Sequence, residues 1–406
     1  MTTTDAAVTL ADIEAARELI KDVVRRTPVE GSRTLSDRVG GPVHFKCENL
    51  QRAGSFKLRG AYTRLVRLSA EERAAGVVAA SAGNHAQGVA LAAQLLGIRS
   101  TIFMPHGAPL PKMQATRAYG AEVKLHGYTL DEAIPEALRF AEETGAVFIH
   151  PFDHRDIVSG QGTVGLEILE QVPDVKTVVV CTGGGGLVAG TAVAVKTLRP
   201  DVRVVAVQAE GAAAYPASLA AGHPVALERM ATMADGIAVG CPGPVPFSLV
   251  ERYVDDVLTV SEESLSKALL LCLERAKLVV EPAGAAACAA VMDNPTAFEP
   301  PVVVVLSGGN IDPLLLHRVL QHGLAAAGRY LSFRALISDR PGGLHGLMGE
   351  LAAVDASVME VEHVRTGAHL RLNEVEVAVQ VETRGPEHAA DVLNRLRDAG
   401  YRVELN

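Results

Sequence analysis

The chain has 406 residues, of which 48% are hydrophobic and 21% are charged, and its formal net charge is -9. This length predicts more than one folding unit, and the acidic balance argues against a nucleic-acid-binding surface. No apolar stretch reaches the roughly 20 residues of a membrane-spanning helix, and the first residues lack the pattern of a signal peptide. The five cysteines show no CxxC spacing, which predicts reduced thiols and a cytoplasmic protein.

The first part of the chain predicts helices that alternate with short strands. Residues 10–28 carry apolar side chains at helical spacing, and Pro28 is expected to end this first helix. Strands are then expected at residues 76–81, 100–105, 121–126 and 146–150, and helices from Asn84, Leu110 and Leu130. Residues from about 50 to 150 are therefore interpreted as a smaller α/β lobe inserted into a larger body.

A second alternating series follows this lobe. Strands are expected at residues 176–181, 202–208 and 301–309, with helices between them. These runs are continuously valine-rich, which is typical of strands buried on both faces of a parallel sheet. Residues 1–328 are therefore predicted to form a two-lobed α/β body with parallel sheets.

The remaining residues, 329–406, have a different pattern. They read as strand, helix, strand, strand, helix and strand at residues 330–339, 343–354, 357–365, 374–382, 387–400 and 401–405. This is the element order of a ferredoxin-like α+β domain. A second, C-terminal domain is therefore expected.

A run of four glycines links a predicted strand of the large body to a helix. Gly183, Gly184, Gly185 and Gly186 directly follow the valine-rich run that ends at Cys181. Such a turn exposes backbone N–H groups at a helix N-terminus, which favours an anion such as a phosphate. The alternative is a tight turn with a structural role alone.

The kind of phosphate is left open by the glycines themselves. Gly184, Gly186 and Ala189 also match a dinucleotide-binding fingerprint, and Glu210 stands close to the place of a ribose-binding acid. An NAD-dependent oxidoreductase is therefore one hypothesis. A P-loop is excluded because no Gly-Lys-Ser/Thr follows the turn.

Two other turns follow predicted strands, at residues 81–85 and 307–310. Ligands of open α/β sheets lie beyond the carboxyl ends of the strands, so the three turns could converge on one ligand. A dinucleotide needs only the first of them. Lys57 stands between Phe56 and Leu58, and by itself this pattern is typical of a surface lysine.

Five segments in order, ENLQRAGSFKLRGAY, SAGNHAQG, GGGGL, EPAGAA and SGGN, resemble the fold type II family of pyridoxal-phosphate enzymes. Within that family they are most similar to the threonine dehydratases, and the resemblance covers nearly the whole chain. The C-terminal domain resembles the ACT-type regulatory domains of amino-acid enzymes. The resemblance implies a two-lobed body that binds pyridoxal 5'-phosphate through Lys57, whose apolar neighbours favour the neutral, nucleophilic amine.

The resemblance also implies roles for the residues of the three turns. Lys57 is expected to be the catalytic residue, which binds the cofactor and moves the α-proton of the substrate. The residues expected to hold the cofactor are Lys57, Phe56, Asn84, Gly183, Gly184, Gly185, Gly186, Leu187 and Ser307. The residues expected to bind the substrate are Ser81, Gly83, Asn84 and His85. A packed histidine at a helix start is the alternative for His85.

Ser307 indicates the type of reaction. By the resemblance it faces the pyridine nitrogen, and a hydroxyl leaves that nitrogen neutral where other pyridoxal enzymes protonate it with a carboxylate. This favours loss of the α-proton together with the β-substituent, as in dehydration of L-threonine to 2-oxobutanoate and ammonia, with a side activity on L-serine. Serine dehydratase and serine racemase are the alternatives on the same cofactor. A methyl group at Ala82 argues against racemisation, because the racemase branch has a serine there.

Two further expectations concern a cation and regulation. Glu210, with main-chain carbonyl groups, is a candidate for a structural monovalent or divalent cation, and a plain surface glutamate is the alternative. The turn at Pro341, Gly342 and Gly343 offers helix-start N–H groups to an amino-acid effector, for which isoleucine or valine is the natural choice in isoleucine biosynthesis. Because ACT-type domains commonly pair, a homo-oligomer is implied. Partnership with nucleic acid or with a membrane is not expected.

Overall fold

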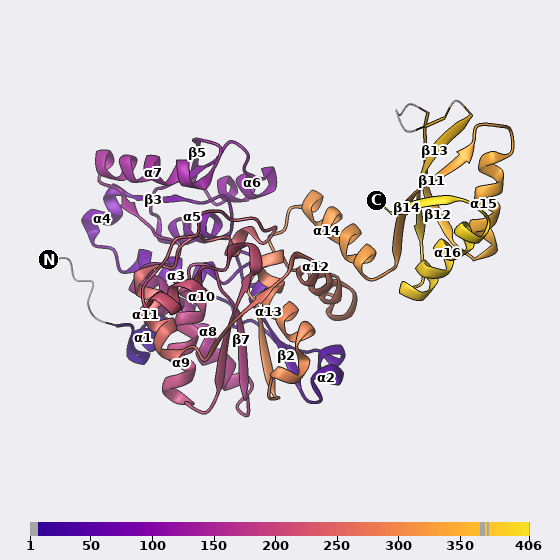
Figure 1. The fold of residues 1–406 in the computed structure, drawn as a ribbon. Helices are drawn as coiled ribbons and strands as arrows, with labels where there is room; N and C mark the ends of the chain where they lie inside the picture. The colour runs from indigo at the N-terminus through magenta and orange to yellow at the C-terminus, as the bar shows by residue number, and fades with distance from the viewer. Residues whose placement is uncertain (1–6, 366–369, 372, 406) are drawn as a thin grey trace. The chain divides into compact units, whose positions relative to one another are not determined.

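The computed structural model describes residues 7–365, 370, 371 and 373–405 (Figure 1). The chain divides into two compact units, Met1–Leu316 and His317–Asn406. The division falls inside helix α14 (Pro313–Ala326), whereas the sequence places the domain boundary after this helix, between residues 328 and 329. Each unit is built around its own sheets and its own core.

The larger lobe of the first unit is built on a six-stranded sheet in the order β1-β2-β10-β7-β8-β9. Its strands are β1 (Val29–Gly31), β2 (Val43–Cys47), β7 (Thr177–Cys181), β8 (Arg203–Ala209), β9 (Asp256–Val260) and β10 (Val302–Leu306). All neighbours are parallel except the edge pair β1 and β2. Every residue of β7 and β10 is buried, as their continuous valine runs predict.

Helices cover both faces of this sheet. Those of the large lobe are α1 (Leu10–Ile20), α2 (Arg33–Val39), α8 (Arg155–Gln171), α9 (Gly186–Leu198), α10 (Ala214–Ala221), α11 (Pro244–Tyr253), α12 (Glu262–Leu271) and α13 (Pro282–Asp293). The inward side chains of α8, α9 and α11 share a core with Val178, Val204 and Val303. Successive side chains of a strand point to opposite faces, and α13 packs against β7 to β10 on the other side.

The smaller lobe has a four-stranded, wholly parallel sheet in the order β5-β4-β3-β6. Its strands are β3 (Val77–Ala80), β4 (Ser100–Met104), β5 (Glu122–Leu125) and β6 (Val147–Phe148). Its helices are α3 (Lys57–Val66), α4 (Ala70–Ala75), α5 (Asn84–Leu96), α6 (Leu110–Ala118) and α7 (Leu130–Thr144). One face packs on α3 and α5, and the other on α7.

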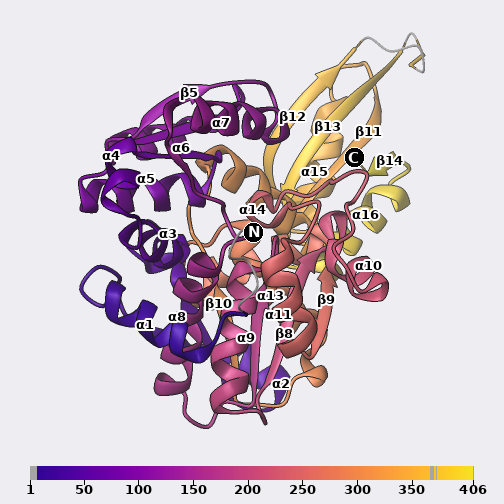
Figure 2. The same ribbon diagram turned by 90° about the vertical axis from the view of Figure 1, so that its left-hand side faces the viewer.

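Helix α3 lies where the two lobes of the first unit meet. It packs against α5 of the small lobe and against α8 of the large lobe, as both views show (Figures 1 and 2). Glycines allow this close approach: a Cβ on Gly160 of α8 would stand 2.6 Å from the Cα of Gly60 on α3. The helix that begins at Lys57 is therefore held from both sides.

The second unit carries an antiparallel sheet in the order β12-β13-β11-β14. Its elements are β11 (Tyr330–Ser338), α15 (Gly343–Ala353), β12 (Ser357–Val364), β13 (Glu374–Glu382), α16 (Pro386–Asp398) and β14 (Arg402–Leu405). Buried residues alternate along β11, as in a sheet that packs helices on one face. The order and pairing are those of a ferredoxin-like domain, so the predicted fold class is confirmed.

Two details differ from the sequence-based expectation. The first helix ends at Ile20 instead of continuing to Pro28. Val23 and Val24 both donate backbone hydrogen bonds to Ile20 O, and their side chains pack on the core of the small lobe. Strands β1, β2 and β9 were not predicted, because their short runs mix apolar with polar residues.

Candidate active site

The segment before Lys57 is attached to the carboxyl end of β10. Phe56 N–H donates to Ser307 O at 3.1 Å, and Gly309 N–H donates to Gly54 O at 2.9 Å. Ser55 forms an isolated antiparallel bridge with Gly308. The start of α3 therefore lies beside the turn that follows β10, although these segments are far apart in the sequence.

The amine of Lys57 lies in an environment that disfavours its charge. Its Nζ donates to the carbonyl oxygen of Pro151 at 2.9 Å and lies 5.2 Å from the ring centroid of Phe56. Burial lowers the pKa of Lys57 to about 8, although Cys181 and Glu281 act in the opposite direction. Neutral amine, the form needed for nucleophilic attack and proton transfer, is therefore more abundant near neutral pH than in an ordinary lysine.

Ser307 and Cys181 stand together at the ends of β10 and β7. The Cys181 thiol donates to the Ser307 hydroxyl at 3.1 Å, and both side chains are buried. Burial raises the pKa of Cys181 to about 11, so it is a neutral thiol. The side chains at the ends of β10 and β7 are therefore an uncharged hydroxyl group and an uncharged thiol.

The glycine run forms the turn between β7 and α9. Gly185 has φ +97°, in the left-handed region, and a Cβ there would stand 1.8 Å from the hydroxyl oxygen of Tyr215. A Cβ on Gly184 would stand 2.4 Å from the ring of Phe152. Packing and backbone conformation thus both require glycine, and the turn brings the first amides of α9 to the end of β7. The first-turn amides of a helix have no partner within the helix and attract anions.

The turn after β3 leads into α5. Gly83 is the N-cap of α5, and its N–H donates to the Ser81 hydroxyl at 3.1 Å. The ring Nε2 of His85 contacts Ile149 O at 2.8 Å, and burial lowers the pKa of His85 to about 3. The neutral imidazole therefore donates to a carbonyl group, which supports the packed-histidine alternative for its side chain.

Asn84 is held by a chain of hydrogen bonds that crosses from one lobe to the other. Its Nδ2 donates to the Glu281 carboxylate, and its Oδ1 accepts from Asn310 Nδ2 at 2.9 Å. Asn310 also donates to Ala53 O at 2.7 Å. Burial, followed by the charge of Asp235, raises the pKa of Glu281 to about 7. This carboxyl group is therefore poised to change charge close to neutral pH.

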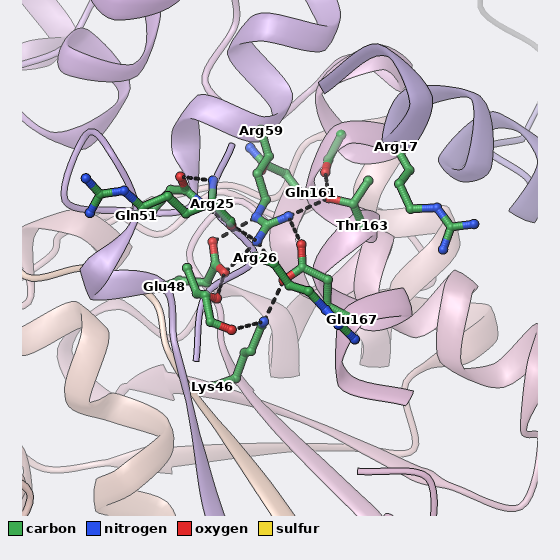
Figure 3. A network of polar contacts seen from close by, with 12 residues as sticks. Arg17, Arg25, Arg26, Lys46, Glu48, Gln51, Arg59, Gln161, Thr163 and Glu167 are labelled. Carbon is green, nitrogen blue, oxygen red and sulfur yellow. Dashed lines mark hydrogen bonds and ion pairs between the residues drawn. The ribbon is translucent and has the colours of Figure 1, made fainter. Parts of the chain in front are cut away.

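A buried ionic network supports the helix that starts at Lys57 (Figure 3). Arg59 is fully buried and donates to both oxygens of Glu48, at 2.8 Å each, and to Glu167 Oε1 at 2.6 Å. Lys46 donates to Glu167 Oε2 at 2.5 Å and to Thr27 O at 2.8 Å. The two cations and two anions balance, which is what makes burial of four charges tolerable.

The sequence-based analysis did not single out several of these residues. Arg59, Glu48, Glu281 and Asn310 stand inside the segments that carried the family resemblance, but no role was given to them. The available signal was their polarity beside apolar runs, since a charged residue in such a place is expected to be paired. Which groups pair with them is a matter of tertiary contact.

The residues present fit pyridoxal 5'-phosphate. The donor set comprises an amine with a lowered pKa, the helix-start amides after the glycine run and the hydroxyl of Ser307. A Cβ placed on Gly83 would have a single described heavy atom within 4 Å, the Lys112 Nζ, when the residues next to Gly83 in the chain are left out. An amine, an anion-binding turn and adjoining free space are what this cofactor and an amino acid require.

Two parallel sheets, a lysine at their meeting point and glycine turns at the strand ends define a fold type II pyridoxal-phosphate enzyme. The chain belongs to this family: residues 20–308 match the family model described as "Pyridoxal-phosphate dependent enzyme". The protein is therefore an enzyme that uses pyridoxal phosphate, and the dinucleotide alternative is set aside.

Two curated relatives match nearly the full length. The L-threonine ammonia-lyase of Thermotoga maritima is 46% identical over 98% of this chain and 99% of its own. The L-threonine ammonia-lyase of Geobacter sulfurreducens is 44% identical over 97% of this chain and 98% of its own. The similarity to both therefore extends past residue 308 into the C-terminal unit.

Solved structures match more than three quarters of the chain. The processed form of threonine deaminase isoform 2 from Solanum lycopersicum has a TM-score of 0.74 at 40% identity, over 77% of this chain and 92% of its own. Maize serine racemase has a TM-score of 0.74 at 37% identity, over 79% of this chain and 99% of its own. The fold thus accommodates more than one reaction, and the substrate has to be argued from the site.

Three further sequence-based expectations concern the rest of the molecule. Glu210 is exposed at the start of a short 3-10 helix (Glu210–Ala212), and the described residues contain no group of three or more His, Cys, Asp or Glu side chains suited to a metal. The five cysteines are free thiols. Within the described ranges, no helix has the length and apolar character needed to cross a membrane.

Proposed function

We propose that the protein is an L-threonine ammonia-lyase, which converts L-threonine to 2-oxobutanoate and ammonia and acts more slowly on L-serine. The observation that carries this proposal is the environment of Lys57: its amine has a lowered pKa, and the preceding residue, Phe56, is hydrogen-bonded to Ser307 at the end of β10. The two nearly full-length relatives named as L-threonine ammonia-lyases support it.

The cofactor would be held by residues from both lobes. Lys57 would bind it covalently, Phe56 would lie beside its ring, and the amides of Gly183 to Leu187 would hold its phosphate. Ser307 would face the ring nitrogen, and Asn84 the ring hydroxyl group. When bound, pyridoxal phosphate withdraws electrons from the substrate Cα, so that the α-proton is acidified and the β-hydroxyl group can leave.

The protein's own residues would then perform two tasks. The neutral amine of Lys57 takes the α-proton, a role for which a pKa of about 8 is well matched to neutral pH. Ser81, Gly83, Asn84 and His85 would bind the substrate carboxylate through the N-terminus of α5, where backbone N–H groups point outward. The neutral ring of His85 takes no part in proton transfer, because it donates to Ile149 O.

The overall reaction balances without a further reactant. Loss of the α-proton and the β-hydroxyl group releases one water molecule and leaves an enamine, which becomes an imine. Hydrolysis of the imine takes one water molecule back and gives 2-oxobutanoate and ammonia. The net reaction is neither an oxidation nor a reduction, so no redox partner is needed.

The test of this proposal is a side-by-side assay of the purified holoenzyme with L-threonine and L-serine. We expect 2-oxobutanoate from L-threonine at a higher kcat/KM than pyruvate from L-serine. A methyl pocket changes preference by only about 1–3 kcal/mol, so the ratio is expected to be modest. Absence of 2-oxobutanoate would remove the proposal.

We also propose that residues 329–406 form an ACT-type regulatory domain and that residues 1–328 form the catalytic domain. Gly342 is the N-cap of α15, with φ +96°, so the turn at Pro341 to Gly343 presents helix-start amides. An amino acid such as isoleucine or valine would bind there through its carboxylate and regulate the enzyme in isoleucine biosynthesis.

Three lesser proposals accompany this one. A homo-oligomer would form through the C-terminal domains, to be tested by light scattering. A cation would bind at Glu210 with main-chain carbonyl groups, to be tested by activity after chelation and return of K⁺ or Mg²⁺. A cytoplasmic location would agree with five free thiols.

A further inference from the structure

One ion pair of the first unit joins the small lobe to the large lobe next to the site. Lys112 of α6 is 6% exposed, and its Nζ donates to Asp235 Oδ2 at 2.7 Å. Asp235 begins a short 3-10 helix (Asp235–Ile237) of the large lobe, and its side chain is 52% exposed. The cation is therefore the buried member of the pair, and the anion reaches solvent.

The position of the ammonium group is unusual for a lysine. Lysine is almost never fully buried, because its long side chain normally carries the charge to water. Lys267 of this protein does so, since it pairs with Glu263 on a surface where both side chains are more than a third exposed. Lys112 instead holds its charge in a buried position, where the ion pair with Asp235 offsets the cost of desolvation.

The charge is directed at the N-terminus of α5. The Lys112 Nζ lies 3.9 Å from the position that a Cβ on Gly83 would occupy. Apart from the residues next to Gly83 in the chain, no other described heavy atom lies within 4 Å of that position. Gly83 is the N-cap of α5, where the substrate carboxylate is proposed to bind. Lys112 and Asp235 also shift the pKa of Glu281 in opposite directions, which places both near the remaining site residues.

We propose that Lys112 provides the positive charge of the substrate-carboxylate site, and that Asp235 is a positioning residue that holds this ammonium group over Gly83. The inference deepens the proposed function and rests on it. A carboxylate at Gly83 would receive backbone N–H groups from one side and a charge-assisted hydrogen bond from Lys112 on the other. The site therefore selects free α-amino acids over their amides, esters and peptides.

The experiment compares ligands that differ only in the carboxylate. L-2-Aminobutanoate, which lacks the leaving hydroxyl group, and its carboxamide are titrated by calorimetry into the holoenzyme and into Lys112→Met, Lys112→Arg and Lys196→Met. Methionine keeps the length and apolar contacts of lysine without its charge. Lys196 is the matched control, because it also pairs with an aspartate, Asp255, at 2.8 Å and its side chain is only 16% exposed.

We expect Lys112→Met to bind the amino acid about 10- to 100-fold more weakly, which corresponds to loss of one hydrogen bond between charged groups. The carboxamide should bind both proteins equally, so the preference for the carboxylate falls by the same factor. Lys112→Arg should recover part of this preference, and Lys196→Met should retain all of it.

Steady-state kinetics give a second measurement. For L-threonine, Lys112→Met should raise KM by a factor similar to its binding defect and change kcat much less. Asp235→Asn should also raise KM, by a smaller factor, and should keep the preference for carboxylate over carboxamide. An unchanged KM in Asp235→Asn would remove the positioning role of Asp235.

A solely structural ion pair predicts a different pattern. Lys112→Met would then have a lower melting temperature, and its affinities for the amino acid and for the carboxamide would fall by the same factor or would both equal those of the parent. Either result overturns the proposal. If Lys112→Met does not fold, the same comparison of the two ligands is made with Lys112→Gln, and the same two outcomes support or overturn the proposal. If the parent enzyme forms no 2-oxobutanoate, the proposed function fails, whereas calorimetry still tests the carboxylate site.

Discussion

Phe56 N–H donates to Ser307 O at 3.1 Å, which joins the residue before Lys57 to the residue that follows β10. The bond is between backbone groups, so it depends on the path of the chain rather than on either side chain. Through it the amine of Lys57 and the hydroxyl group of Ser307 are brought to the same end of the large sheet. One contact thus sets the relation between the proposed catalytic amine and the group proposed to face the ring nitrogen.

Replacement of Lys57 by alanine should abolish turnover and leave the fold intact. Turnover should be lost because the amine is the proposed point of covalent attachment and the proposed base. The fold should stay intact because burial already disfavours the charge of this amine, so its removal does not destabilise the protein. Activity, circular dichroism and melting temperature measure these two effects, with the exposed Lys21→Ala as control. Borohydride reduction of the parent followed by peptide mapping should place the label on Lys57, and a label elsewhere would contradict the assignment.

Replacement of Glu281 by glutamine should change how stability depends on pH. The pKa of Glu281 is raised to about 7 in the folded protein from 4.5, so its stabilising contribution is complete below pH 4.5 and is lost as pH rises through 7. Glutamine resembles the protonated form at every pH. The melting temperature of Glu281→Gln relative to the parent should therefore be higher at pH 8 than at pH 5.

The cofactor-free proteins are the ones to compare by calorimetric scanning, since the bound cofactor would add its own charges near Asn84. A difference in melting temperature that is the same at both pH values would show that Glu281 does not titrate in this range.

Replacement of Arg59 by methionine should destabilise the protein by about 3–5 kcal/mol, because it leaves Glu48 and Glu167 buried without their main cation. Arg59, at the centre of this network (Figure 3), belongs to the first turn of α3, which starts at Lys57, so a loss of cofactor affinity is expected with it. Urea unfolding and cofactor titration measure the two effects. Arg33→Met removes a surface pair with Asp37 at 3.9 Å and should change stability by less than about 0.5 kcal/mol.

Elimination should dominate over racemisation. Racemisation requires a second acid or base on the face of the substrate opposite Lys57, and the methyl group of Ala82 can carry no proton. Chiral chromatography of the reaction with L-serine should show pyruvate and almost no D-serine. D-Serine formed at a rate comparable to pyruvate would contradict this, and Ala82→Ser should increase D-serine relative to the parent.

Removal of the C-terminal domain should separate regulation from chemistry. A chain that ends at Arg329 keeps α14 and loses the sheet that begins at Tyr330. We expect it to retain basal turnover of L-threonine and to lose every response to isoleucine, valine and leucine. If the intact enzyme neither binds these amino acids by calorimetry nor changes its kinetics, the domain serves oligomerisation instead.

The sequence by itself determined the class of the fold and the order of the elements, except for strands β1, β2 and β9. Strands β7, β8 and β10 could be predicted because burial on both faces leaves a continuous run of valines. The six elements after Gly328 could be predicted because their apolar residues recur with the period of a strand or a helix. The glycine run was also readable, since Gly185 adopts a left-handed conformation that other residues rarely take.

The tertiary structure alone decided which polar groups meet. The partners of Arg59, Asn84, Lys112 and Glu281 lie on other elements and, for most of them, in the other lobe. No periodicity of the chain records such pairs, because a hydrogen bond depends on distances of about 3 Å between atoms that only the packed lobes bring together. For the same reason the burial that lowers the pKa of Lys57 depends on the packed lobes, although its apolar neighbours in the sequence already favoured a neutral amine.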